Sequence, residues 1–301
     1  MGNFNSIQGL RGFRALSGFL FVLLTAACAH GTGQVWNSQG QPINREELLK
    51  GLLTHKVILL GENHGVKSHQ DQHLEILQSL RQAGLRIHVG MEFFSYTDQA
   101  WVDRYRQGEI TEAEFLKAIR WGSPSYDFYR DQAVFPRLEL GERTWALNAP
   151  RSLTGRIARV GLNQLTAEER SLLPPNFQLG RDSYKKRFIE AMGGLDHLPS
   201  PEVTDRYFAA QSVWDDTMAW QISRILEQDP EAVVVVIVGE FHVQYGGGLP
   251  DRLKARGISS LTTVSQIQLQ NLKPEELQKA VQPHAEYGPR ADWIWGSSTI
   301  D

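Results

Sequence analysis

The sequence predicts an α/β fold, in which a mostly parallel central sheet is flanked by helices and interrupted by a helical insertion or cap. Two β-branched hydrophobic runs, at residues 56–61 and 233–239, each close on a glycine, as buried strands that end in a tight turn do. The first run begins a strand–helix–strand pattern of about 35 residues, which is the size of a βαβ unit with parallel strands. With 301 residues, 41% of them hydrophobic, the chain can bury a full core.

The other elements follow from apolar periodicity and from the glycines and prolines that interrupt it. We expect helices at 44–53, 69–83, 98–106, 111–119, 130–140 and 249–256. We expect further strands at 86–91, 144–148 and 258–264. Residues 151–230 are largely helical in pattern and too long for a simple crossover, so they predict the insertion that covers the site.

The N-terminus indicates export. Arg11 and Arg14 precede a short apolar stretch that cannot span a bilayer of roughly 30 Å as a permanent helix. Small residues then lead to Cys28, and Leu24 stands four positions before it, which is similar to the lipobox of bacterial lipoproteins. We therefore expect Cys28 to be lipidated; an ordinary signal peptide with an incidental cysteine is the alternative.

These features divide the chain into three parts. We expect a lipoprotein signal peptide at 1–27, a polar tether at 28–43 and a single domain at 44–301 that contains the helical insertion. Ala29, rather than an aspartate, follows the cysteine and indicates the outer membrane. The expected location is the bacterial cell envelope, on the periplasmic face of the outer membrane through a lipid anchor.

Composition excludes several classes of function. Cys28 is the only cysteine, so the chain has no intramolecular disulfide, no thiolate metal cage and no attached c-type haem. The net charge of −3 is spread along the chain without a basic stripe, so a nucleic acid is not an expected partner.

The pattern Gly-Glu-x-His occurs twice, 178 positions apart, each time at the end of a predicted strand. The first copy supplies Glu62 and His64, and the second supplies Glu240 and His242. Glu92 follows another predicted strand. Open α/β sheets bind ligands at the carboxyl ends of their strands, so we expect these five side chains to meet at one edge.

Two kinds of chemistry suit this set. His64, His242 and Glu92 form a two-histidine, one-carboxylate group that fits a divalent ion such as Fe²⁺, Mn²⁺ or Zn²⁺. Without a metal, a histidine can act as a general base beside a glutamate whose pKa is raised by burial. His69, on the next helix, is a further candidate ligand, whereas we expect His73 on the surface.

Tyrosines in predicted loops form a second candidate group. Tyr126, Tyr129 and Tyr245 lie in such loops, and an exposed tyrosine can ligate ferric haem. Most aromatic residues nevertheless belong to protein cores. The glycines at 246–248 lack the Lys-Ser/Thr of a phosphate-binding loop and indicate a close approach of backbone or ligand.

Taken in chain order, the motifs resemble the ChaN-like lipoproteins, which are haem-binding uptake proteins of the Tiki superfamily. The resemblance covers about residues 45–296. Its motifs are Gly61-Glu62-Asn63-His64, Gly90-Met91-Glu92, Asn148-Ala149-Pro150-Arg151, Asp215-Asp216-Thr217-Met218-Ala219, Gly239-Glu240-Phe241-His242 and Ala291-Asp292-Trp293-Ile294-Trp295.

The resemblance implies an iron-regulated lipoprotein that binds haem for uptake, with two haems stacked in a homodimer and an outer-membrane haem receptor as a partner. It also implies that tyrosine ligates the haem iron with help from histidine. The candidate ligands are His64, His69, Tyr96, Tyr126, Tyr129, His242 and Tyr245.

The wider superfamily leaves an enzyme as the alternative. Its Tiki and erythromycin-esterase branches resemble hydrolases, and the roles of their histidine and glutamate positions map onto His64, His242, Glu62, Glu92 and Glu240. A periplasmic metal-dependent hydrolase of an ester or a peptide therefore stands beside haem binding. A scaffolding lipoprotein with a vestigial site is the third possibility.

Overall fold

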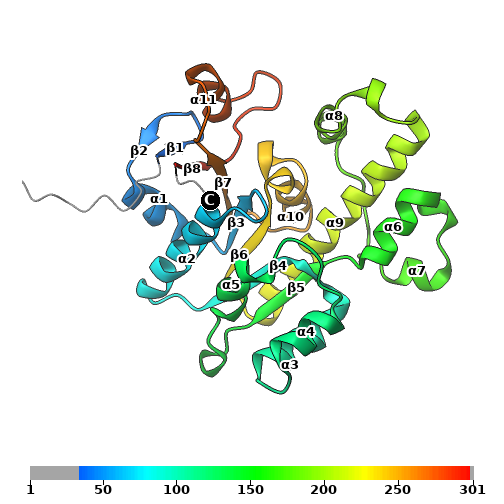
Figure 1. Ribbon diagram of the computed structural model, residues 1–301, viewed down its shortest axis with the longest axis horizontal. Coiled ribbons are helices and arrows are strands. Elements are labelled where there is room, and N and C mark those ends of the chain that lie inside the picture. The colour runs from blue at the N-terminus through cyan, green and yellow to red at the C-terminus, as the bar shows by residue number, and fades with distance from the viewer. Residues whose placement is uncertain (1–33, 299–301) are drawn as a thin grey trace, which may run out of the picture. The chain divides into compact units, whose positions relative to one another are not determined.

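The computed structural model describes residues 34–298, which form an eight-stranded sheet with helices on both faces (Figure 1). The strand order is β2-β1-β8-β7-β3-β6-β4-β5. The strands are β1 (Val35–Asn37), β2 (Pro42–Ile43), β3 (Val57–Glu62), β4 (Ile87–Ser95), β5 (Thr144–Asn148), β6 (Val233–Gly239), β7 (Leu261–Gln268) and β8 (Trp293–Ser297). The predicted signal peptide and Cys28 lie outside the described residues.

The centre of the sheet is parallel, which confirms the predicted fold class. β3 pairs in parallel with β6 and β7, and β4 pairs in parallel with β6 and β5. Since β6 lies between them, β3 and β4 are not direct neighbours, although they belong to one βαβ unit. Among the strands of residues 34–298, the antiparallel pairs are those of β1 with β2 and with β8.

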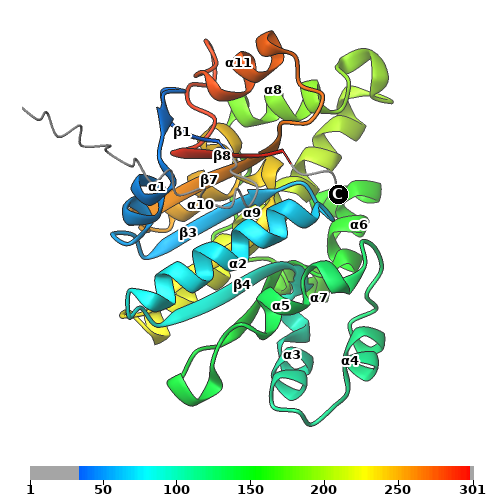
Figure 2. The same ribbon diagram turned by 60° about the vertical axis from the view of Figure 1, so that its left-hand side comes forward.

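Successive residues of the central strands point to opposite faces and bury two separate cores. On one face, the strands pack against α1 (Arg45–Leu52), α2 (Lys67–Gln82) and α5 (Arg130–Val134). On the other face, they pack against α9 (Pro201–Gln228) and α10 (Leu249–Ala255). Figure 2 shows α2 lying across the strands on the first face. Burial on both faces explains why residues 57–60 of β3 and 233–238 of β6 are all hydrophobic.

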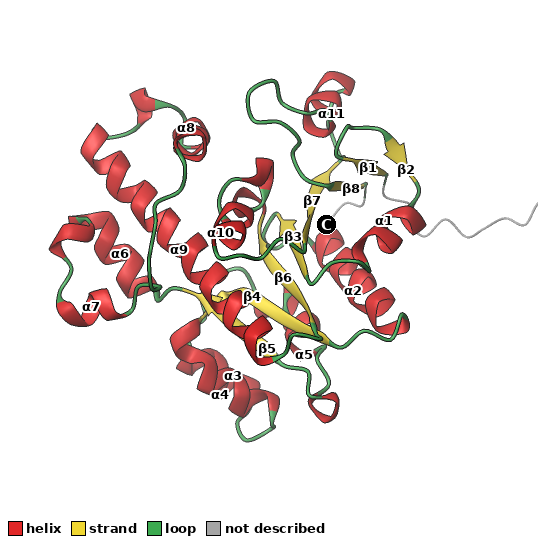
Figure 3. Cartoon of the chain, turned by 180° about the vertical axis from the view of Figure 1, so that it is seen from behind, coloured by secondary structure: helices red, strands yellow, loops and turns green. Residues whose placement is uncertain are grey.

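Two further groups of helices surround this core. α3 (Gln99–Arg106) and α4 (Glu112–Ala118) follow β4, and α4 starts with a capping box formed by Thr111 and Glu114. Residues 151–228 form α6 (Arg151–Val160), α7 (Ala167–Ser171), α8 (Asp182–Ala191) and the long α9. α6, α7 and α8 gather around the N-terminal part of α9, beside the sheet (Figure 3). No helix within residues 34–298 is long and apolar enough to cross a membrane.

Several predictions about the elements need correction. The tether does not extend to residue 43, because β1 and β2 join the sheet edge. The expected helix at 130–140 ends at Val134, shortly before a proline that cannot continue it. The strand expected at 258–264 is β7, which begins at Leu261 and continues to Gln268. β8 and α11 (Pro274–Val281) were not predicted, because their apolar runs are short.

Replacing Ile237 by alanine should lower the free energy of unfolding by about 2–5 kcal/mol, because it leaves a cavity in the central strand. Ile237 is fully buried in β6, between β3 and β4. Chemical denaturation measures the change. Leu195→Ala is the control, since Leu195 is 63% exposed; equal losses in both variants would contradict this description of the core.

Candidate functional site

Three adjacent strand ends gather the polar residues predicted from the sequence. Glu62, the last residue of β3, stands opposite Gly239, the last residue of β6. Glu92 lies in β4, on the other side of β6, and its Oε2 accepts a hydrogen bond of 2.5 Å from the amide of Gly239. The structure thus places the residues of both Gly-Glu-x-His copies and Glu92 at the carboxyl edge of one parallel layer.

His242 lies between two carboxylates. Its Nδ1 is 2.6 Å from Oδ1 of Asp215, and its Nε2 is 3.4 Å from Oε1 of Glu92. Asp215 also accepts a hydrogen bond of 2.9 Å from the hydroxyl of Tyr184. The amide of Gln211 is 3.0 Å from the same hydroxyl and 3.2 Å from Nδ1 of His242. Burial makes these charge-assisted contacts strong and fixes the ring orientation.

This arrangement keeps His242 and Glu92 ionised. Burial lowers the pKa of His242, but the charges of Asp215 and Glu92 outweigh it and raise the pKa to about 10. Burial raises the pKa of Glu92, but the charge and hydrogen bond of His242 outweigh it and lower the pKa to about 2. Near neutral pH the floor of the site is therefore an imidazolium flanked by carboxylates.

His64 is held differently. Its Nδ1 is 3.0 Å from Oε1 of Glu62, and that oxygen also accepts a hydrogen bond of 2.7 Å from the hydroxyl of Tyr129. The side chain of His64 is 42% exposed, whereas that of Glu62 is fully buried. Burial lowers the pKa of His64, and the hydrogen bond to Glu62 and the nearby Glu92 raise it further than burial lowers it. With Nδ1 directed at Glu62, Nε2 is the nitrogen available to a ligand.

Glu240 bonds neither of the two histidines, although it lines the same cavity as both. Its Oε1 accepts hydrogen bonds of 2.8 Å and 2.5 Å from the guanidinium of Arg290 and another from the hydroxyl of Ser265. Glu240 is buried, and this ion pair fastens the segment before β8 to the end of β6. Its role in the structure is therefore to fix the site loop.

A cavity of about 920 Å³ opens above this floor, and His64 and Glu92 form part of its lining. Its other walls come from β4, the loop before α5, and helices α6, α8 and α9. About half of the lining side chains are apolar or aromatic: Phe93, Ala118, Ile119, Pro124, Ala149, Pro150, Ala158, Phe188, Met192, Tyr207, Ala210 and Trp214. A second cavity of about 420 Å³ shares His64 and Gln211 with it and reaches His242.

The predicted metal set has no support in this geometry. Within residues 34–298, no group of three or more His, Cys, Asp or Glu side chains is arranged to hold a metal ion. The reason at His242 is that Asp215 and Glu92 engage its two nitrogens and keep the ring protonated, so it lacks a free lone pair. In this structure His242 pairs with Glu92 and Asp215, and His64 pairs with Glu62.

The structure separates the four candidate tyrosines. Tyr126 and Tyr129 are buried in the core beneath α2, not in an exposed loop, and burial raises the pKa of both phenols. Neither can reach a large external ligand. Tyr96 is half-buried beside the large cavity, whose lining includes its neighbours Ser95 and Thr97, and its hydroxyl donates to the carbonyl of Leu172 at 3.1 Å.

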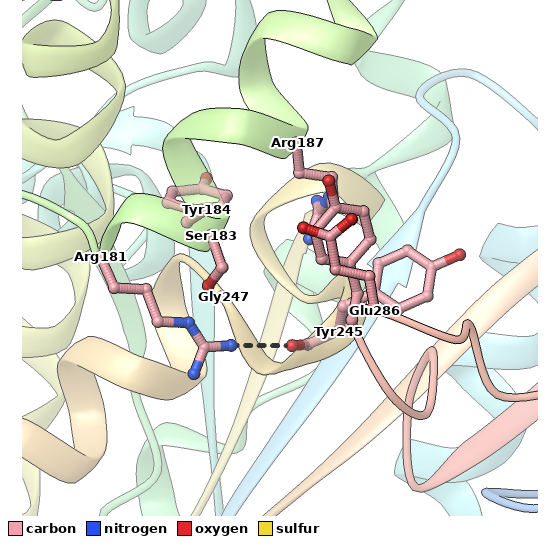
Figure 4. A pocket seen from close by; sticks show the side chains of 8 residues that line it. Arg181, Ser183, Tyr184, Arg187, Tyr245, Gly247 and Glu286 are labelled. Atoms are coloured by element: carbon pink, nitrogen blue, oxygen red, sulfur yellow. Dashed lines mark hydrogen bonds between the residues drawn. The ribbon is translucent and has the colours of Figure 1, made fainter.

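Tyr245 lines a different cavity of about 170 Å³ (Figure 4). This cavity lies between α8 and the loop that follows His242. It is too small for a macrocycle. Tyr245 therefore belongs to a separate pocket and not to the large cavity.

The two histidines of α2 lie behind the site and not within it. His69 and His73 are fully buried. Nδ1 of His69 accepts a hydrogen bond of 3.2 Å from the amide of Asn63, and Nε2 of His73 is 2.6 Å from Oε1 of Gln266. The surface position expected for His73 is wrong, because a polar network under β3 encloses it, and burial lowers its pKa.

Sequence reasoning gave no role to the residues that support His242, although Asp215 stands in one of the motifs that resemble the family. Asp215, Gln211 and Tyr184 come from α8 and α9, about 30 to 60 positions before His242. The adjacent pair Asp215-Asp216, inside an otherwise apolar helix stretch, was the available signal. Asp215 bonds His242, and Asp216 forms an ion pair of 2.8 Å with Arg256.

The fold and site define an α/β protein with a buried histidine–carboxylate network beneath a large, partly apolar cavity. The family described as "Haem-binding uptake, Tiki superfamily, ChaN" matches residues 48–253, and the chain belongs to this family. Among proteins of curated function, none matches the sequence.

One solved structure has a similar fold, and a second is more distant. The structure described as cofacial heme binding to ChaN of Campylobacter jejuni is 18% identical, with a TM-score of 0.64, and the match covers 89% of this chain and 97% of that one. An erythromycin esterase mutant in its open conformation is 12% identical, with a TM-score of 0.45, over 90% of this chain and 84% of that one.

The shifted pKa values of His242 and Glu92 predict how the free energy of unfolding depends on pH. The pKa of His242 is raised from 6.5 to about 10, so its stabilisation is complete below pH 6.5 and is lost as pH rises through about 10. The pKa of Glu92 is lowered from 4.5 to about 2, so its stabilisation is complete above pH 4.5 and is lost as pH falls through about 2. Replacing Asp215 by asparagine should lower the pKa of His242, which NMR titration of the ring measures.

Asp216→Asn is the matched control for this titration. Asp216 is as buried as Asp215 and lies next to it, but it bonds Arg256 and not His242. Asp216→Asn should reduce stability and leave the His242 titration unchanged. An equal shift of the His242 pKa in both variants would show that Asp215 does not set it.

Proposed function

We propose that this protein binds haem in the large cavity and serves haem uptake. The observation that carries the proposal is the cavity of about 920 Å³, since ligand pockets span roughly 300–1,000 Å³ and this one suits a large ligand. Phe93, Phe188 and Trp214 contribute aromatic faces to its lining, which suit a flat, apolar macrocycle.

Charge at the exposed edge of the cavity fits the carboxylates of haem. Arg120 and Arg151 both line the cavity and are exposed, and among residues 34–298 neither has a carboxylate within 4.0 Å. A β-carbon at Gly122 would lie 4.0 Å from Nη1 of Arg151, so the two arginines flank the same loop. Guanidinium groups bind carboxylates in a bidentate manner, which favours a ligand with an apolar body and acidic substituents.

One phenol lines this cavity, and a second belongs to a residue whose two neighbours line it. Tyr96 is half-buried at its edge, and Tyr207 lines it directly with no partner for its hydroxyl among the described residues. Phenolate is an established axial ligand of ferric haem. His64 presents Nε2 to the same space, oriented by Glu62. We therefore place iron ligation at Tyr96 or Tyr207, with His64 close by.

The proposal includes the location and partners of the protein. The lipobox-like segment ending at Cys28, followed by Ala29, supports a lipid anchor in the bacterial outer membrane with the domain on the periplasmic side. An outer-membrane haem receptor is the proposed partner, and a homodimer around stacked haems is the proposed bound form. These parts of the proposal rest on the sequence and on family membership.

Titration of the purified protein with haemin should give a saturable Soret band that differs from that of free haemin. Tyr96→Phe or Tyr207→Phe should remove the phenolate charge-transfer features and weaken binding at least tenfold. Tyr245→Phe is the control, because Tyr245 lines the smaller cavity. A spectrum that stays that of free haemin would rule the proposal out. Normal binding by both phenylalanine variants would rule out the two proposed ligands.

A periplasmic hydrolase is the second candidate, and one observation favours it. At the floor of the large cavity, His64 presents a free ring nitrogen next to the Glu92–His242 ion pair. His64 can accept a proton from water while Glu62 stabilises the resulting imidazolium, and the His242 charge can stabilise an oxyanion. Both histidines thus have roles that suit hydrolysis of an ester or a peptide.

If the protein is such a hydrolase, His64→Ala and Glu92→Gln should each reduce turnover by roughly 10²- to 10⁴-fold. A screen of ester and peptide substrates measures this, with circular dichroism to verify folding. His197→Ala is the control, because His197 is exposed and far from the strand ends in sequence. Activity that survives both site variants would come from a contaminant, and the hydrolase would be rejected.

A further inference from the structure

The small cavity between α8 and the loop after His242 has an excess of positive charge. Arg181, Arg187, Ser183 and Tyr245 lie around it (Figure 4). Within residues 34–298, neither arginine has a carboxylate within 4.0 Å of its guanidinium. Glu286 also lines the cavity, but it is paired with a lysine of α8, with N–O distances of 2.6 and 2.7 Å.

Arg187 is the unusual member of this group, because it is only 7% exposed. Its guanidinium donates to the backbone carbonyls of Phe241, at 2.7 Å, and of Gln244. It also lies over the rings of Phe241, Tyr184 and Tyr245, at 4.3 to 5.5 Å. These contacts are all neutral, and burial lowers the pKa of Arg187. The charges of Asp215 and Glu240 act on Arg187 from a distance, but within residues 34–298 no carboxylate touches its guanidinium. A buried cation that lacks a direct ion pair is costly, so a negatively charged ligand in contact with it would be stabilising.

The loop beside Arg187 carries a second unusual feature. Tyr245 has a left-handed backbone, with φ at +59°, between Val243 and Gly246. A non-glycine residue in this region is strained and persists where the surroundings hold it. Its amide donates to the carbonyl of Arg290 at 2.7 Å, and its carbonyl accepts from Arg181 at 3.0 Å (Figure 4). The strain thus aims the Tyr245 ring at the cavity, next to both arginines.

We propose that this cavity is a binding site for a small oxyanion, namely a phosphate or carboxylate group, distinct from the haem cavity. Arg181 and Arg187 supply the charge, and guanidinium groups bind such anions through paired N–H donors. The hydroxyls of Ser183 and Tyr245, which have no bonding partner among the described residues, supply further donors. The cavity volume of about 170 Å³ matches a group of this size and excludes a porphyrin.

The site is joined to the histidine network through the backbone. Arg187 holds the carbonyls on both sides of His242, those of Phe241 and Gln244. An anion that neutralises Arg187 therefore stabilises the segment that carries His242. The anion site does not depend on haem binding, so the two proposals can succeed or fail separately.

Thermal unfolding and calorimetric titration of the haem-free protein with inorganic phosphate test the proposal. Phosphate should give a saturable binding heat and should raise the Tm with the logarithm of its concentration, by about 3–5 °C at a tenfold excess over Kd, while sodium chloride at equal ionic strength should do neither. Acetate in a parallel titration distinguishes a carboxylate site from a phosphate site. A saturable effect of either anion agrees with the proposal, and the absence of both overturns it.

Variants locate the bound anion. Arg181→Ala should weaken the effective anion at least tenfold without unfolding the loop, because the Arg181 side chain bonds only the carbonyl of Tyr245. Arg181→Lys should retain part of the affinity. Arg159→Ala is the matched control, since Arg159 is exposed on α6 and has no ion pair within residues 34–298. An unchanged anion effect in Arg181→Ala, or an equal loss in Arg159→Ala, overturns the proposal.

Discussion

The parallel register of β3, β6 and β4 is the constraint on which the site depends. It sets Gly239 against the end of β3, and this position has little room for a side chain. A β-carbon there would lie 3.0 Å from Cε1 of His64, 3.1 Å from Nε2 and 3.5 Å from Glu92. The amide of Gly239 also binds Glu92. The glycine therefore lets two strand ends and a histidine ring occupy one small volume, and a β-carbon there would require the His64 ring to move by a few tenths of an ångström.

Burial determines which ionised side chains are stable at these strand ends. An isolated buried charge would neutralise itself by a pKa shift, but His242 stays charged because Asp215 and Glu92 stand on either side. Asp215 is satisfied in turn by Tyr184. Since each member depends on the next, removing one partner leaves a buried charge unpaired, and the network stabilises a single arrangement of the strand ends.

The sequence predicts those parts of the fold and site that depend on local patterns. It does not predict contacts between residues that are far apart in the chain. The central strands and the meeting of His64 and His242 at one edge follow from local patterns and from the rules of parallel sheets. Asp215 could not be placed, because only the packing of α9 against the sheet brings it to His242. Tyr129 was misjudged for the same reason, since it is buried only when α2 and β4 pack over it.

The two copies of Gly-Glu-x-His have different roles because they are offset by one residue in the pairing of β3 with β6. Glu62 is still in β3, faces the core beneath α2 and orients His64 toward the cavity, whereas Glu240 follows β6 and turns to Arg290. His242 therefore takes its carboxylate from a helix and has both nitrogens engaged. Of the two histidines, His64 keeps a ring nitrogen that an outside ligand can contact. A ligand of this pair would therefore contact His64, while His242 contributes its charge to the surroundings of that ligand.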